Sequence, residues 1–181
     1  MTFQSYRSSW VVFGLALALL VGFSAGAAVA ADEDAGEATL ALAGKKITVA
    51  YGRPSTEGKG YKALDKGIEE GFMWRMGKNK ATTLETEADL KFGDVAVKAG
   101  KYSLVAKKTK DGWEMLVHPE WDRWGTPVPK EGYVATIPLK VAKAKEAAKL
   151  LTIGLEEKDG EGHLILTWGP DQLSAAFKIA S

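Results

Sequence analysis

The chain has 181 residues, with 24 basic and 23 acidic side chains and no cysteine. A net charge near zero provides no general attraction to nucleic acid or to an anionic membrane. The absence of thiols excludes disulfides, thiol catalysis and cysteine-bound zinc or iron–sulfur centres. Once a leader is removed, about 150 residues remain, enough for one domain with its own core.

The first 30 residues have the three-part pattern of a secretory signal peptide. Arg7 is the only charged residue among them, and it precedes an apolar run from Trp10 to Phe23. Small residues ending in Ala28-Val29-Ala30 then give an A-x-A cleavage pattern. We therefore expect residues 1–30 to be a signal peptide and the mature protein to be exported, either periplasmic or secreted.

An uncleaved membrane anchor is the alternative interpretation of this leader, since a span needs roughly 20 apolar residues. Gly14, Gly22 and Gly26 interrupt the run, and acidic residues begin at Asp32. The chain also lacks a cysteine that could carry a lipid. These features predict a protein with no stable membrane anchor after signal cleavage.

The rest of the chain consists of short apolar or alternating runs separated by turn residues. Residues 31–44 are small and acidic, and we expect a flexible lead-in there, before a single β-rich domain over residues 45–181. Period-two alternation and β-branched or aromatic residues indicate the strands. In chain order, the expected strands are 46–51, 81–87, 94–97, 101–106, 113–117, 133–141, 150–156, 163–168 and 173–179.

Turn and helix signals complete the predicted fold. Asp111-Gly112 is the clearest hairpin turn, because glycine tolerates the positive φ that a tight reversal requires, and Asp159-Gly160-Glu161-Gly162 is a second turn signal. Pro138 indicates an edge strand or a bulge. Residues 61–70 and 142–150 have helix-forming composition. The pattern predicts an all-β, mainly antiparallel β-sandwich, with a small barrel as the alternative and one or two short helices.

Three stretches carry a family resemblance: Tyr51–Ser55, Trp74–Thr82 and Ala99–Leu104. Together and in this order, they resemble the bacterial family of uncharacterised proteins called domain of unknown function 2911. The resemblance extends over about residues 47–179 and implies an exported β-rich domain with no established activity. Lys78 and Lys80 flank Asn79 where the family usually has an alanine and an acidic residue, so an acidic ligand or base would be missing here.

A first group of candidate site residues combines arginine, asparagine and aromatic side chains. Arginine offers a planar fork of donors suited to carboxylate, phosphate or sugar hydroxyls, and asparagine adds a donor and an acceptor. The group indicates a site for a small carbohydrate or anionic ligand. In the structural alternative, Trp74 is core, Arg75 pairs with an acid and Asn79 holds a turn. The group comprises Tyr51, Arg53, Trp74, Arg75, Asn79 and Thr82.

A second group lies in a proline-rich stretch. Trp121 and Trp124 belong to it, with Trp113 and Tyr133 nearby in the sequence. Exposed rings would suit stacking on sugar rings or docking on a partner protein. Alternatively, the rings fold back to cover one open end of the sandwich, as large aromatic residues tend to be buried.

Catalytic and metal signals are weak. His118, Glu120 and Asp122 alternate along the chain, but the other histidine, His163, lies far along the sequence, so we expect no metal site. Neither a G-x-S-x-G elbow nor a phosphate-binding glycine loop is present. We therefore assign no catalytic residue and expect no cofactor.

These observations favour an exported cell-envelope protein that binds a ligand or a partner without catalysis. The ligand would be a carbohydrate or anionic small molecule, or the partner another envelope protein. The alternative is an envelope hydrolase that acts on carbohydrate or ester with Asp and Glu as catalytic groups, because such carboxylates are placed by the fold rather than by sequence spacing. A purely structural or accessory role is a third hypothesis.

Overall fold

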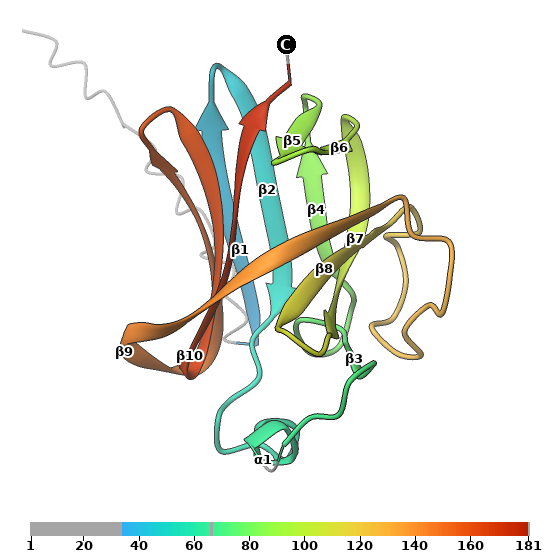
Figure 1. The fold of residues 1–181 in the computed structure, drawn as a ribbon, viewed down its shortest axis with the longest axis vertical. Coiled ribbons are helices and arrows are strands. Elements are labelled where there is room, and N and C mark those ends of the chain that lie inside the picture. The colour runs from blue at the N-terminus through green and yellow to red at the C-terminus, as the bar shows by residue number, and fades with distance from the viewer. Residues whose placement is uncertain (1–33, 66, 181) are drawn as a thin grey trace, which may run out of the picture. The chain divides into compact units, whose positions relative to one another are not determined.

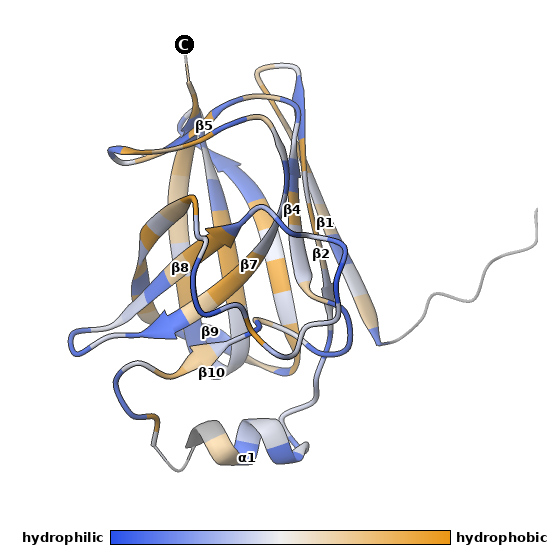
Figure 2. Cartoon of the chain, turned by 90° about the vertical axis from the view of Figure 1, so that its right-hand side faces the viewer, coloured by the Kyte–Doolittle hydropathy of each residue, from blue (hydrophilic) through white to orange (hydrophobic). Residues whose placement is uncertain are grey.

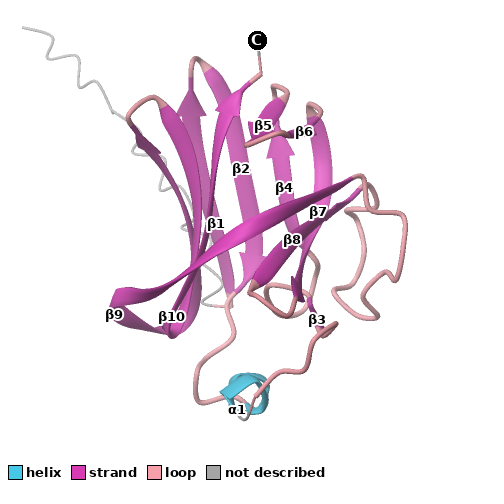
Figure 3. Ribbon diagram, viewed as in Figure 1, coloured by secondary structure: helices cyan, strands magenta, loops and turns pink. Residues whose placement is uncertain are grey.

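The fold is known from a computed structural model that describes residues 34–65 and 67–180. The predicted signal peptide lies outside the described residues. Ten antiparallel strands and one helix make up the described chain (Figures 1 and 3). The elements are β1 (Ala35–Leu42), β2 (Lys45–Gly52), α1 (Lys59–Asp65), β3 (Met73–Trp74), β4 (Thr82–Thr86), β5 (Leu90–Phe92), β6 (Val95–Val97), β7 (Gly100–Lys108), β8 (Trp113–His118), β9 (Ala135–Lys158) and β10 (Glu161–Ile179).

The strands form one sheet in the order β1-β2-β4-β7-β8-β9-β10-β5-β6, and β3 adds to β7. The pairing path does not return to its first strand, so the sheet is open, consistent with the predicted sandwich rather than with the closed barrel. It folds over because β9 is long: residues 135–139 pair with β8, and residues 140–158 pair with β10. The far part of β9 also bonds to the segment after β2, where Leu151 N donates to Pro54 O at 2.9 Å.

The core lies between the facing parts of this folded sheet. Ile47 and Val49 of β2, Leu151 and Ile153 of β9, and Phe177 of β10 are all buried in one hydrophobic cluster. Along β2 and most of β10, buried apolar residues alternate with half-buried or exposed ones, as period-two geometry requires. Figure 2 shows the hydrophobic residues concentrated along strands such as β7 and β8, whereas the connecting turns are mostly hydrophilic.

Two predicted segments differ in the structure. Residues 35–42, expected in a flexible lead-in, form β1 and pair with β2 from Ala35↔Gly52 to Leu42↔Lys45. Ala43 and Gly44 turn the chain with φ angles of 49° and 73°. The small residues of β1 suggested flexibility, yet they suit an edge strand whose backbone bonds are met by β2.

Residues 142–150, expected to be helical, lie inside β9. Their helix preference amounts to at most about 0.7 kcal/mol per residue between good and ordinary helix formers. Pairing with β10 on the same strand, from Lys140↔Ser174 onward, outweighs that local preference. The other helical expectation, over residues 61–70, is confirmed in part, since α1 occupies Lys59–Asp65 but residues 67–70 are not helical. No helix in the described segments is apolar and long enough for a membrane span.

The predicted hairpin turns are confirmed. Thr109 N donates to Gly112 O at 3.0 Å across the reversal between β7 and β8. Asp159 and Gly160, with φ angles of 54° and 79°, join β9 to β10. Pro138 pairs with Glu114 of β8 and lies outside the residues that pair with β10, as expected for a residue without a backbone N–H.

Candidate functional site

Two hollows in the domain are lined by all five tryptophans of the described residues, three at one and two at the other. The larger is a groove of about 700 Å³ between the β1–β2 hairpin and two loops. The smaller is an aromatic pocket of about 260 Å³ near α1. They share no lining residue, so each is described separately.

One wall of the groove is the loop that joins β3 to β4. Its shape is maintained by backbone-directed bonds: Arg75 Nε donates to Gly77 O at 3.0 Å, and Thr82 Oγ1 donates to Met76 O at 3.0 Å. Met76 and Asn79 have positive φ angles of 54° and 62°. Such conformations are uncommon outside glycine and are tolerated best by asparagine.

The second wall is the loop at residues 121–125, and it pairs with the first. Ala81 N donates to Arg123 O at 3.2 Å, and Gly125 N donates to Asn79 O at 2.9 Å. Lys80 and Trp124 form an isolated β-bridge. Inside this loop, Arg123 Nη1 donates to Trp124 O at 2.9 Å. The two loops therefore form one continuous rim.

Strands β1 and β2 supply the floor of the groove. Tyr51 of β2 is buried and lies against Gly36 of β1, its register partner, where a side chain would collide with the phenol ring. Gly52 meets the first wall directly, because a Cβ atom there would collide with the Lys78 carbonyl oxygen.

Both acidic and basic side chains line the groove, together with two exposed tryptophan rings. Trp121 and Trp124 are 40% and 57% exposed. Lys101 Nζ lies 4.2 Å from the centre of the Trp121 ring and 3.1 Å from a Glu85 carboxylate oxygen. Lys78 forms an ion pair with Asp34. The lysine charges at this site are thus partly balanced by neighbouring carboxylates.

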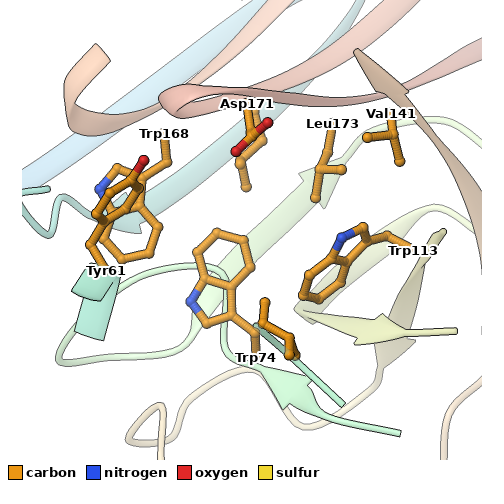
Figure 4. A pocket seen from close by; sticks show the side chains of 9 residues that line it. Tyr61, Trp74, Trp113, Val141, Trp168, Asp171 and Leu173 are labelled. Atoms are coloured by element: carbon orange, nitrogen blue, oxygen red, sulfur yellow. The ribbon is translucent and has the colours of Figure 1, made fainter. Parts of the chain in front are cut away.

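The aromatic pocket is built from segments far apart in the sequence (Figure 4). Trp74 stacks on Trp168 with ring centres 5.4 Å apart and planes 9° apart, and Trp113 packs edge to face with Trp74, with ring centres 6.3 Å apart. Tyr61 of α1 packs against Trp168 at 5.0 Å. Its hydroxyl end lies over Gly169 (φ 60°), where any side chain would collide with the ring.

Asp171 is the acidic residue of the aromatic pocket, and it faces the rings in Figure 4. Lys143, its cross-strand partner on β9, forms an ion pair with it at 2.5 Å. The hydrogen bond to Asp171 raises the pKa of Lys143, and the negative charge of Asp171 acts in the same direction. An ammonium group is therefore stabilised at this edge of the pocket.

The sequence also matches a protein-family model across nearly all of the β domain. That model is described as "Protein of unknown function (DUF2911)", and it matches residues 33–179. The chain belongs to this family. The resemblance carried by the three sequence motifs is confirmed by this match. Comparisons with curated proteins and with solved structures gave no match.

In this DUF2911 domain, the predicted site residues separate into four sets, the fourth of which is the pair of arginines. Tyr51, Asn79, Trp121 and Trp124 come together in the groove. Trp74 lines the aromatic pocket instead. Thr82 is buried beneath the first wall.

Arg53 and Arg75 line neither hollow. Arg53 Nε donates to Leu151 O at 3.4 Å, and Arg75 Nε is bonded to Gly77 O. Both arginines therefore brace the backbone in this structure.

The residues around His118 hold the second wall in place. His118 is buried, and its Nδ1 accepts a hydrogen bond from Glu120 N at 3.2 Å. Ser103 Oγ donates to Glu120 O at 2.8 Å. Within residues 34–65 and 67–180, no three His, Asp or Glu side chains are grouped as metal ligands.

Sequence reasoning missed most of the aromatic pocket of this DUF2911 domain. Tyr61, Trp168 and Asp171 were not among the candidates, and Trp113 was noted only as part of a local aromatic cluster. The four residues come from α1, β8 and β10. No sequence spacing links them, although Trp168 and Asp171 lie within two residues of Gly169, which interrupts the alternation of β10.

Proposed function

We propose that this protein is an exported binding domain of the cell envelope whose groove takes a carbohydrate chain without cleaving it. The observation that carries the proposal is the exposure of Trp121 and Trp124 on a single groove of about 700 Å³. Large aromatic side chains are usually buried, and exposed ones on a concave surface are typical of binding sites. Flat rings of this kind stack on the apolar face of a sugar ring.

The polar lining of the groove favours a neutral polyhydroxyl ligand over a strongly anionic one. Lys78 and Lys101 already lie against Asp34 and Glu85, which reduces the positive charge available to an anion. The arginines that suggested an anionic ligand, Arg53 and Arg75, are bonded to backbone oxygens. Amide, ammonium and carboxylate groups around the rim supply donors and acceptors for hydroxyls.

The hydrolase alternative receives less support from the same geometry. Asp34, Glu37 and Asp122 line the groove, and all three are exposed. A carboxyl group that acts as a general acid near neutral pH usually has its pKa raised by burial. Among the described residues, no Asp or Glu is buried. Binding without catalysis is therefore the stronger proposal.

Export is supported by where the domain begins. The first strand, β1, starts at Ala35 and the family match at residue 33, shortly after the predicted cleavage site at Ala30. A leader with a positive end, an apolar middle and an A-x-A pattern precedes them.

The experiment is affinity electrophoresis and calorimetry of the purified protein with soluble neutral and anionic polysaccharides. We expect binding to a neutral glycan, weakened by up to about tenfold by Trp121→Ala and by Trp124→Ala, since stacking on one ring contributes about 0.5–1.5 kcal/mol beyond area burial. Phe72→Ala is the matched control, because Phe72 is 40% exposed, as Trp121 is, but lies outside the groove.

Two outcomes would contradict the proposal. Glycan binding that survives both tryptophan substitutions would place the ligand elsewhere. Release of reducing ends from a bound glycan, lost in Asp122→Asn, would instead indicate the hydrolase.

A further inference from the structure

The aromatic pocket is separate from the groove and is not used by the proposed function. It has the composition of a receptor for an organic cation: several rings, one carboxylate and an otherwise apolar lining. Its lining residues are Tyr61, Ile68, Trp74, Trp113, Val141, Leu166, Trp168, Asp171 and Leu173. We infer that this pocket is a second binding site, and that its ligand carries a quaternary or N-methylated ammonium group.

The rings supply the first part of the argument. Trp74 and Trp113 are partly exposed and lie roughly edge-on to each other, with planes 66° apart, so together they present two differently oriented surfaces. In Figure 4 these two rings and Asp171 surround the same space. The face of an aromatic ring carries negative charge density, and tryptophan attracts a cation most strongly.

The charged groups of the lining indicate the sign of the charge that the ligand carries. Among the described residues, Asp171 is the only carboxylate in the lining and no lysine, arginine or histidine belongs to it, although Lys143 outside the lining pairs with Asp171. An anionic ligand would meet both the Asp171 carboxylate and the negative ring faces, and both would repel it. A cation is attracted by both.

The small number of polar groups distinguishes an alkylated ammonium from a sugar. A sugar ring in this pocket would need a partner for each enclosed hydroxyl, and unpaired buried hydroxyls are costly. The lining offers chiefly Asp171 and the ends of Tyr61 and the indoles, alongside Ile68, Leu166 and other aliphatic side chains. A methylated ammonium needs no hydrogen bond, because its methyl groups pack against apolar surface while its charge is attracted to the rings and the carboxylate.

Lys143 shows where the positive charge would sit. Its ammonium group is paired with the Asp171 carboxylate at the pocket edge. The Lys143 side chain is 75% exposed, so it can move into solvent at little cost when another cation arrives. Lys143 is thus a competitor for the site, and its removal should strengthen binding.

The experiment is a calorimetric titration of the purified protein with choline, in parallel with 3,3-dimethylbutanol, the uncharged carbon analogue of choline. We expect choline to bind at least about tenfold more tightly than the analogue, because only choline gains from the rings and the carboxylate as a cation. Asp171→Asn should weaken choline binding about tenfold and leave binding of the analogue unchanged. Lys143→Met should strengthen choline binding severalfold.

Both substituted residues are exposed, so the variants are expected to fold, and circular dichroism checks this. Equal affinity for choline and the analogue, or no choline binding by either the wild type or Lys143→Met, would overturn the inference. Trp124→Ala serves as the control that separates the two sites. This variant should leave choline binding unchanged while it weakens glycan binding. Failure of one proposal would therefore not imply failure of the other.

Discussion

Gly52 ends β2 directly against the loop that forms the first wall of the groove. Its lack of a side chain lets the Lys78 carbonyl oxygen approach the backbone more closely than a Cβ atom would allow. Backbone atoms cannot yield as a flexible side chain can. The position therefore requires glycine for contact rather than for backbone conformation.

We expect Gly52→Ala to lower the free energy of unfolding by about 1–3 kcal/mol, as overpacking against a fixed neighbour does. It should also weaken glycan binding, because the wall must shift. Gly154→Ala is the matched control: a Cβ on Gly154 in β9 meets no atom within 4 Å, so this change should be neutral or slightly stabilising. Urea denaturation measures both, and equal losses would contradict the contact argument.

Tyr133 anchors the loop that carries the second wall. Its hydroxyl donates to Pro129 O, and its ring contacts His118 edge to face at 5.4 Å. Burial raises the pKa of Tyr133, while the nearby Arg123 charge acts in the opposite direction. The phenol is therefore harder to ionise in the folded protein than in the unfolded chain.

This shift predicts a loss of stability in alkaline solution. Because the folded-state pKa lies above the unfolded value, the contribution of Tyr133 is complete below about pH 10 and disappears as the pH rises through the folded-state pKa. Tyr133→Phe should be less stable at pH 8 and should lose less stability between pH 8 and pH 11. Parallel stability curves for the two proteins, from urea denaturation at each pH, would contradict this prediction.

At the scale of elements, β1 is the least expected part of the domain. It covers the whole length of β2 and contributes to the floor of the groove through Gly36 and Glu37. Leu42 at its end belongs to the core. A chain that begins at Lys45, the predicted domain start, would leave the edge of β2 unpaired.

We expect a protein of residues 45–181 to melt roughly 10 °C or more below a protein of residues 31–181, since each kcal/mol lost is worth about 2–4 °C at this size. The exposed edge of β2 should also promote association. Differential scanning calorimetry and size-exclusion chromatography measure these effects. A protein of residues 34–181 is the control, because it removes only chain before β1. Equal melting temperatures for all three would show that β1 is dispensable.

At the scale of the whole molecule, export is the prediction with the simplest readout. When the full chain is expressed in a bacterium, we expect the mature protein outside the cytoplasm to begin Ala31-Asp32-Glu33-Asp34, because cleavage follows the A-x-A pattern. Ala28→Arg should block cleavage and accumulate the longer precursor, since the peptidase accepts small residues there.

Val29→Leu is the matched control for this experiment, because the middle position of the pattern is not restricted to small residues. N-terminal sequencing and intact mass measure both variants. A protein that keeps residues 1–30 in every fraction would instead support the uncleaved anchor.

The sequence by itself determined the all-β class, the family and most strand positions. It could do so because these depend on local features: period-two alternation, β-branched residues, and turns such as Asp111-Gly112 and Asp159-Gly160. Four candidate residues of the groove were also identified, because they lie in the family motif or in a conspicuous aromatic loop.

Only the tertiary structure decided how distant residues combine. It made residues 142–150 a strand, because β10 offers a long pairing partner that a short helix cannot match. It assigned Trp74 to a pocket with Trp113, Trp168 and Asp171, and it committed Arg53 and Arg75 to backbone oxygens. Side chains on well-separated strands become neighbours through the order and folding of the sheet, which no spacing along the chain records.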